Sequence, residues 1–170
     1  MFAHLNRWIG VALLGGGAYA LIFGLRPLGA ALILAGLVGL YALQRERIGR
    51  VGLAGLLIAG IGLLGFGAIG VWRWFSPEWT PSLSVTLRGA VIALALGLIL
   101  FGRATNRAAI MPRHTGTGLI VAALMIVLTG VGIYAFGLCL AWLGYSVLRG
   151  NYIVAAPTRT ARAAHIDKPT

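Results

Sequence analysis

The sequence predicts an all-α protein, a polytopic transmembrane bundle of six helices, and three observations lead to this fold class. Of the 170 residues, 59% are hydrophobic and only 10% are charged, whereas about 25% of the residues of a soluble domain are charged. The apolar residues gather in long runs. The basic residues lie between those runs. Too few charges remain to cover a water-soluble surface of this size, which excludes a soluble enzyme.

The first four apolar runs each predict one membrane span. They cover about residues 8–25, 28–43, 51–72 and 83–101, and a spanning helix needs about 20 residues, with ~17 to 25 as the usual range. Pro27 is well placed to open the second span, because proline ends a preceding helix and fits the first turn of the next. The connections between the first three runs are short, so we expect these spans to pack as antiparallel neighbours.

The first run also has features of a secretory signal. Arg7 precedes it, and residues 18–20 fit a small-x-small cleavage pattern. The run stays apolar beyond this pattern as far as Leu25 and leads directly into Pro27 and the second run. We therefore interpret it as a retained first helix.

The last apolar run, residues 118–148, fits either one helix or two. A single helix over this run would be about 46 Å long, against a hydrocarbon core of ~30 Å. With one helix, seven Lys and Arg residues fall on each side of the membrane; with two, eleven fall on one side and three on the other. Cytoplasmic loops carry the excess of basic residues. We therefore expect six spans, the last two at about 115–130 and 132–148 with a turn within 129–132, and both termini in the cytoplasm; five spans are the alternative. The three basic residues on the outer side are then Arg26, Arg73 and Arg88.

This topology predicts one domain, the bundle of residues 1–150, followed by a tail of residues 151–170. The tail contains two prolines and scattered charge, and we expect it to be disordered and cytoplasmic. The net charge of +11 raises the question of nucleic acid binding, but the basic residues lie between apolar runs, as topology determinants do. We expect a multi-pass protein of the cell membrane. Its expected partners are membrane lipids, other membrane protein subunits or a second copy, and no nucleic acid.

The connection after the third span is rich in aromatic residues. It contains Trp72, Trp74 and Trp79, three of the five tryptophans of the chain, and indole rings favour the headgroup region of a bilayer. Arg88 lies about two turns into the fourth span, where its side chain can extend to the outer interface. We predict these four residues as candidate contacts with lipid or with a partner.

Small residues recur at helical spacing in several spans. In the first and the last span, glycine returns every seven residues. Seven-residue steps stay close to one helix face, drifting by only ~20° per heptad, and small residues on such a face let two backbones approach closely. We predict helix packing at Gly10, Gly17, Gly24, Gly55, Gly62, Gly137 and Gly144.

The sequence predicts no catalytic, cofactor or metal site. A hydrolase needs carboxylates held together, and a metal site needs clustered ligands. Glu46 and Glu78 are expected on opposite sides of the membrane, and the three histidines have no ligand spacing. The single cysteine, Cys139, lies inside an apolar run and forms no intrachain disulfide. We therefore expect a protein that is not an enzyme.

Five short stretches resemble a known group of proteins. They are LVGLYALQ (37–44), GRVGLAG (49–55), GLILFG (97–102), MPR (111–113) and AWLGY (141–145). In these stretches the chain resembles small polytopic bacterial integral membrane proteins of unknown function, and the resemblance extends over most of residues 8–148. It implies a multi-helix bundle that ends in the helix carrying Trp-Leu-Gly-Tyr. It implies no activity, cofactor or binding residue.

Two functions from different classes agree with these observations. The first is a structural or accessory subunit, whose small-residue helix faces and tryptophan-rich connection pack against helices or lipids. The second is a small transporter or channel for a neutral or lipophilic solute. Ion-coupled transport usually places charged groups or broken helices near the midplane. The predicted spans have neither at that depth, since Arg88 lies only about two turns in, so we favour the first.

Overall fold

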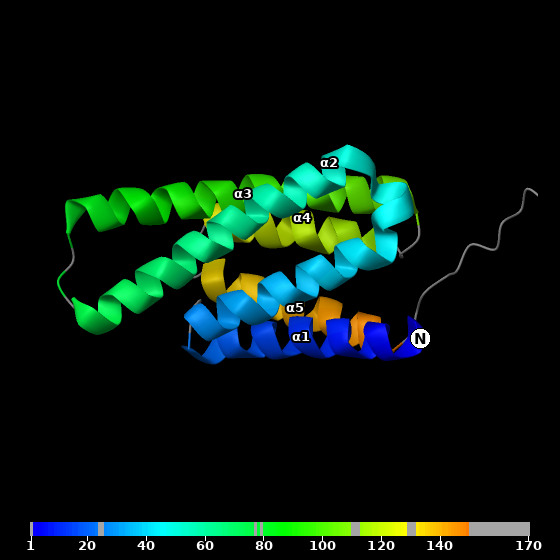
Figure 1. The fold of residues 1–170 in the computed structure, drawn as a ribbon, viewed down its shortest axis with the longest axis horizontal. Helices are drawn as coiled ribbons and strands as arrows, with labels where there is room; N and C mark the ends of the chain where they lie inside the picture. The colour runs from blue at the N-terminus through cyan, green and yellow to red at the C-terminus, as the bar shows by residue number, and fades with distance from the viewer. Residues whose placement is uncertain are drawn as a thin grey trace, which may run out of the picture.

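A computed structural model gives the fold and describes residues 2–23, 26–76, 78, 80–109, 113–128 and 132–149. The prediction of an all-α protein is confirmed, since these residues form helices and no strand occurs among them (Figure 1). The helices are α1 (Phe2–Phe23), α2 (Pro27–Phe75), α3 (Pro81–Ala108), α4 (Arg113–Leu128) and α5 (Gly132–Leu148).

Helix α2 consists of two arms that meet at Gly49. This residue has φ 64° and ψ −169°, outside the helical region, and it interrupts an element of 49 residues that would be about 73 Å long if it were straight. A Cβ built on Gly70 would lie 2.7 Å from Cδ of Pro27, and one built on Gly60 would lie 3.5 Å from Cδ1 of Leu34. The second arm, residues 50–75, therefore folds back along the first arm, residues 27–48, as Figure 1 shows.

The helices extend beyond the spans that hydropathy predicts. The expected connection over residues 44–50 is helical except at Gly49, and α3 continues past residue 101 to Ala108. Hydropathy locates the part of a helix that suits hydrocarbon, whereas Arg, Thr and Asn can continue the helix past that part. A single glycine suffices for the bend, because the left-handed half of backbone space costs glycine little.

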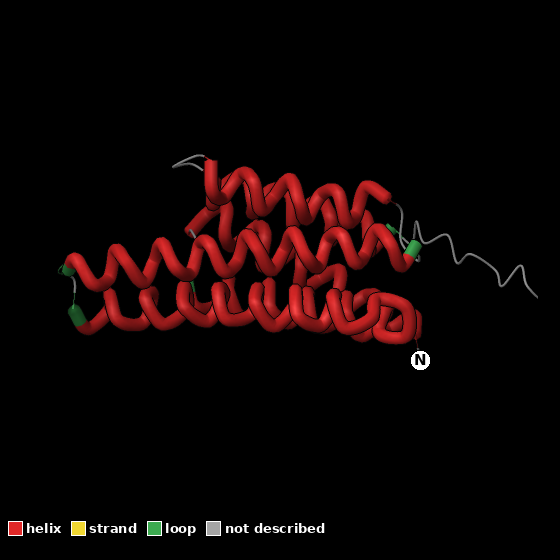
Figure 2. The backbone as a smooth tube through the Cα atoms, turned by 90° about the horizontal axis from the view of Figure 1, so that it is seen from above, coloured by secondary structure: helices red, strands yellow, loops and turns green. Residues whose placement is uncertain are grey.

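The helices pack in a closed cycle. Contacts join α1 to α2 and α5, α3 to α2 and α4, and α4 to α5, and Figure 2 shows the helices lying side by side. The core that they enclose is apolar, and its largest fully buried side chains are Phe101, Phe136, Leu13, Ile33, Leu37, Leu40, Leu63, Leu94, Leu98, Leu119, Leu140 and Leu143.

The start of α1, the bend of α2 and the ends of α3 and α5 lie at one end of this bundle. A Cβ built on Gly10 would lie 2.6 Å from Cγ of Leu148 in α5, and Ile48 at the bend lines a pocket together with Ala104 near the end of α3. The first residues of α1 and the bend lie on the right in Figure 1. The start of α4 lies there too, since a Cβ built on Gly102 would lie 2.6 Å from the carbonyl oxygen of Gly116. We call this end the arginine end, because its described arginines are Arg7, Arg45, Arg47, Arg50, Arg103, Arg107, Arg113 and Arg149.

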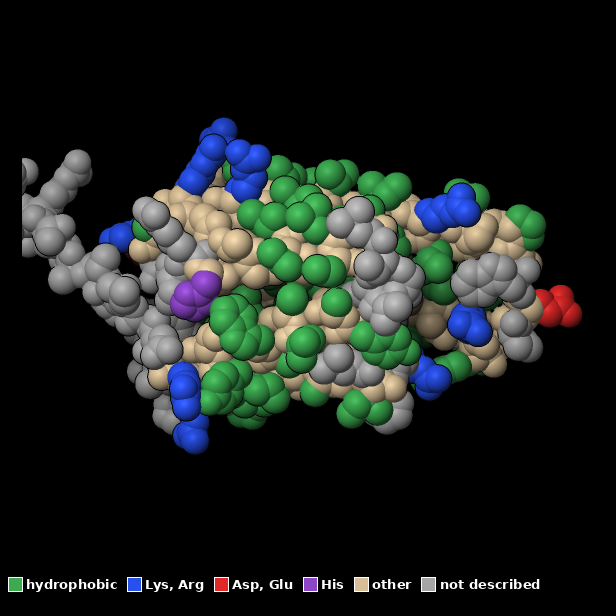
Figure 3. Space-filling model, turned by 180° about the vertical axis from the view of Figure 1, so that it is seen from behind, with side chains coloured by type: hydrophobic (Ala, Val, Ile, Leu, Met, Phe, Trp, Pro, Cys, Tyr) green, Lys and Arg blue, Asp and Glu red, His purple; other side chains and the backbone are tan. Residues whose placement is uncertain are grey.

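The opposite end holds the connection between α1 and α2 and the connection between α2 and α3. We call it the tryptophan end, and its described basic and indole side chains are those of Arg26, Arg73, Arg88, Trp72 and Trp74. In Figure 3 the basic side chains gather toward the two ends, and hydrophobic side chains cover the surface between them. Large apolar side chains are exposed there, including Leu57 (59% exposed), Ile61 (65%) and Leu138 (61%).

Helices α2 and α3 are long enough and apolar enough to cross a membrane, judged by length and composition alone. Two shorter apolar segments follow, His114–Val127 in α4 and Tyr134–Leu148 in α5. The run of residues 118–148 thus contains parts of two helices. The turn expected within residues 129–132 lies outside the described residues except for Gly132, which begins α5, and the tail of residues 151–170 also lies outside them.

Candidate functional site

The glycines of α1 and α5 meet each other. A Cβ built on Gly17 would lie 2.5 Å from both the carbonyl oxygen of Gly137 and the backbone nitrogen of Ala141. Seven residues away along both helices, a Cβ built on Gly144 would lie 2.7 Å from the carbonyl oxygen of Gly10. The two seven-residue glycine patterns therefore form one seam between the first and the last helix. Gly24 lies outside the described residues.

A second glycine seam joins the second arm of α2 to α3. A Cβ built on Gly55 would lie 2.6 Å from the backbone nitrogen of Phe101, and one built on Gly62 would lie 2.5 Å from that of Leu94. From the α3 side, Gly97 packs against Ala59. A Cβ that meets backbone has no flexible side chain to displace, so both seams require glycine at these positions.

The aromatic residues of the tryptophan end lie on the last turn of α2. Trp72 is 56% exposed and Trp74 is 69% exposed. The helix ends directly after them, where the N–H of Ser76 donates to the carbonyl oxygen of Trp72 at 2.9 Å. Arg88 is exposed on α3, near the exposed Val85. Trp79 lies outside the described residues.

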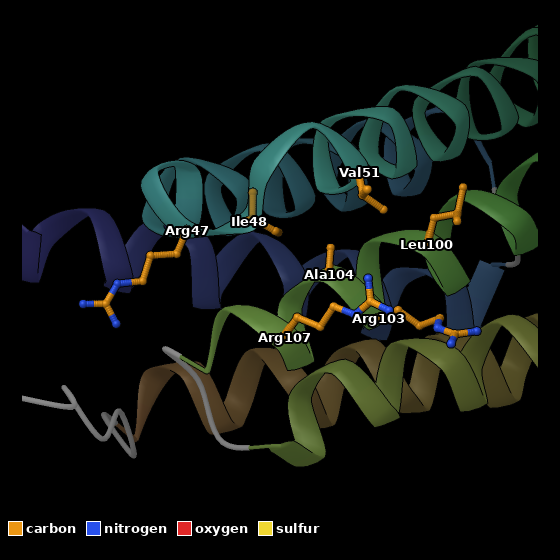
Figure 4. Close-up of a pocket in the computed structure, with 7 residues that line it drawn as sticks. All are labelled: Arg47, Ile48, Val51, Leu100, Arg103, Ala104 and Arg107. Carbon is orange, nitrogen blue, oxygen red and sulfur yellow. The ribbon is translucent and has the colours of Figure 1, made fainter.

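A pocket at the arginine end is lined by three arginines. It has a volume of about 370 Å³ and lies between α2 near its bend and the last two turns of α3 (Figure 4). Its basic lining residues are Arg47, Arg103 and Arg107, and the described residues that line it include no carboxylate. Its apolar lining residues are Ile48, Val51, Leu100 and Ala104.

The two α3 arginines lie on one face of their helix. Arg103 and Arg107 are four residues apart, and residues at this spacing are neighbours on a helix surface. Figure 4 shows their side chains extending in the same direction, while Arg47 extends the opposite way. Two guanidinium groups thus share the pocket from α3, and a third flanks it from α2.

Uncharged polar side chains are buried in the interior near the same end. Gln44 is 0% exposed, Thr105 1% and Thr115 4%. They lie, respectively, near the bend of α2, near the end of α3 and at the start of α4. Hydroxyl and amide groups do not titrate near neutral pH, so these residues supply no acid or base.

The described histidine and cysteine side chains are those of His114 and Cys139, and they belong to no metal cluster among the described residues. No group of three His, Cys, Asp or Glu side chains comes together in the described part of the chain. The ring of His114 instead packs edge to face against Trp142, with 5.3 Å between the ring centroids. Glu46 lies at the bend of α2 and Glu78 between α2 and α3, at opposite ends of the bundle.

The arginine pocket is not among the sites that the sequence analysis predicts. Hydropathy places Arg103 and Arg107 in a loop after residue 101, where their spacing has no structural meaning. Once α3 is known to continue to Ala108, the four-residue spacing places both arginines on one face. The pattern Arg-x-x-x-Arg directly after an apolar run is the signal that indicates such a pair.

No protein-family model matches the chain, and comparison with curated proteins and with solved structures finds no match. The function is therefore inferred from the geometry of the chain itself.

Proposed function

We propose that the protein is a multi-pass integral membrane protein that acts as a structural or accessory subunit. Its six spans would be α1, the two arms of α2, α3, α4 and α5, with the arginine end in the cytoplasm. The single observation that supports this proposal best is the belt of exposed apolar side chains between two charged ends. Monomeric soluble proteins rarely expose apolar patches of more than a few hundred Å², whereas lipid tails cover such a belt.

The distribution of charge supports the orientation. Eight of the described arginines lie at the arginine end and three at the tryptophan end, and cytoplasmic segments carry the excess of basic residues. The exposed Trp72 and Trp74 fit the opposite headgroup region, where an indole ring has an apolar face and a wet N–H.

The accessory role is supported by the kinds of residue that pack the interior of the bundle. Two glycine seams bring helix backbones into close contact, and the described interior polar groups are uncharged. What such a bundle offers to other molecules is its surface, and the tryptophan end contributes the exposed side chains of Trp72, Trp74 and Phe75 to that surface.

Gentle extraction tests the accessory role. We expect the wild-type protein, extracted from its native membrane in digitonin, to have a protein mass above the 17.8 kDa of one chain, because a second copy or another subunit remains bound. W72A/W74A should reduce this mass to that of one chain. The matched control is Trp8→Ala, since Trp8 is 72% exposed at the arginine end. A wild-type protein that runs as a single chain would contradict an accessory role and favour the solute transporter or channel.

A further inference from the structure

We propose that the pocket lined by Arg47, Arg103 and Arg107 binds the phosphate group of an anionic phospholipid from the leaflet at the arginine end. This inference rests on the proposed membrane location and adds a ligand class and a site to it. The observations that carry it are the pocket of about 370 Å³ with Arg47, Arg103 and Arg107 in its lining, the shared direction of the Arg103 and Arg107 side chains and the apolar helix face that leads away from the pair.

The charge of the pocket calls for an anion. Arg103 and Arg107 repel each other across one helix turn, and the described lining includes no acidic side chain to offset them. A guanidinium group presents a planar fork of N–H donors that matches two oxygens of a phosphate. One phosphate held by Arg103 and Arg107 satisfies donors of both groups and removes their repulsion, while Arg47 contributes positive charge to the rim on the α2 side without pointing at the pair.

The face of α3 beside the pocket distinguishes a lipid from a free phosphate. Moving from the arginine pair toward the middle of the bundle, the same face continues with Leu100, Leu96 and Ile92, in steps of three and four residues. Leu96 is 53% exposed and Ile92 is 56% exposed. A phosphate bound at the arginine pair can therefore place its acyl chains along an exposed apolar stripe, which a free phosphate cannot use.

The α2 side of the pocket has the same order of polar and apolar groups. Arg47 lies at its outer edge, Ile48 is buried and Val51 is 49% exposed one turn further in. Basic pockets between transmembrane helices on the cytoplasmic side are a known form of anionic lipid site. Basic residues nearer the end of the bundle and apolar residues toward its middle match a phospholipid in both parts of its structure.

Lipid titration of the full-length protein tests the assignment. The protein is purified in mild detergent, stripped of lipid, and titrated with phosphatidylglycerol, phosphatidylcholine or inorganic phosphate while native mass spectrometry counts the bound molecules. We expect phosphatidylglycerol to bind and phosphatidylcholine to bind at least roughly tenfold more weakly, because the anionic lipid keeps its net charge for the guanidinium groups. R103Q/R107Q should weaken phosphatidylglycerol binding by at least roughly tenfold, since both charge-assisted contacts are lost.

R45Q/R50Q is the matched control. It removes two exposed arginines from the same end of the bundle, beside the bend and outside the pocket lining, so it changes the net charge equally. We expect it to bind phosphatidylglycerol as the wild type does. Equal losses in the two double variants would overturn the pocket assignment in favour of unspecific charge attraction. Binding of inorganic phosphate as tight as that of phosphatidylglycerol would overturn the lipid assignment.

Carbonate extraction of native membranes separates this inference from the proposed function. If the wild-type protein stays in the membrane pellet while phosphatidylglycerol shows no preference for the intact pocket, the lipid site is wrong and the membrane location stands. Release of the protein into the carbonate supernatant would instead contradict the proposed function itself. Circular dichroism of R103Q/R107Q checks that the variant keeps its helices, so that lost binding is not lost folding.

Discussion

At the scale of single residues, Gly49 determines the path of the chain. Its φ of 64° and ψ of −169° lie in a region of backbone space that is essentially restricted to glycine. A Cβ built there would meet nothing within 4 Å, so space is not the reason for glycine at this position. The backbone conformation alone requires it, in contrast to the glycines of the two seams.

Replacing Gly49 with alanine tests whether glycine is required there by the backbone conformation and not by lack of space for a Cβ. We expect Gly49→Ala to lower the free energy of unfolding by about 1–3 kcal/mol, because alanine is strained in this conformation. Thermal unfolding in mild detergent, or titration with a denaturing detergent, measures the change. Gly89→Ala is the control: Gly89 lies within α3 and is also open on its Cβ side, so alanine should raise stability by up to about 1 kcal/mol. Equal effects of the two substitutions would disprove the role of backbone conformation.

At the scale of the helices, the seam between α1 and α5 joins the two sequence-distant ends of the bundle. Gly17 lies against backbone atoms of Gly137 and Ala141. The axes of α1 and α5 can approach this closely because position 17 has no side chain. Any side chain at Gly17 must push the two helices apart, since neither backbone atom can rotate away.

Gly17→Leu tests this seam. We expect it to lower the free energy of unfolding by at least about 1–3 kcal/mol, the usual cost of overpacking a close contact. Gly15→Leu places the same side chain two residues away, where a Cβ meets nothing within 4 Å, and should change stability by less than about 0.5 kcal/mol. Denaturing detergent titrations of the two variants give the comparison; a tolerated leucine at Gly17 would show that the seam opens freely.

The helices themselves could be predicted from the sequence, and their ends could not. Apolar runs mark the helix parts that suit hydrocarbon, but Arg103 and Arg107 are as compatible with a helix as with a loop, so hydropathy could not place the arginine pocket. The glycine spacing in α1 and α5 indicated packing faces. It could not show that the two faces meet, because a periodic pattern specifies a face of one helix and not its partner. The bend at Gly49 could not be predicted either, because nothing in the sequence distinguishes this glycine from the many others in the chain.

At the scale of the whole molecule, the two ends differ in their number of basic residues. The described acidic residues also divide between them, with Glu46 beside the bend of α2 and Glu78 between α2 and α3. Both side chains are exposed, so each residue marks one end and can carry a label.

Cysteine labelling at these two residues tests the orientation. In a Cys139→Ala background, Glu78→Cys should react with a membrane-impermeant maleimide on intact cells, because the proposed topology places it outside. Glu46→Cys should react only after the membrane is permeabilised. The reverse pattern would mean that the arginine end faces outward, and reaction of both residues on intact cells would contradict a single orientation.

The seam between α1 and α5 also has a consequence for the time course of biogenesis. Gly17 and Ala141 touch, yet synthesis at roughly 5–20 residues per second places α5 about 6–25 s behind α1. Throughout that interval the glycine face of α1 has no counterpart in the nascent chain. Closing the cycle of helices therefore has to wait for the synthesis of α5, and until then the glycine face of α1 is without its native partner.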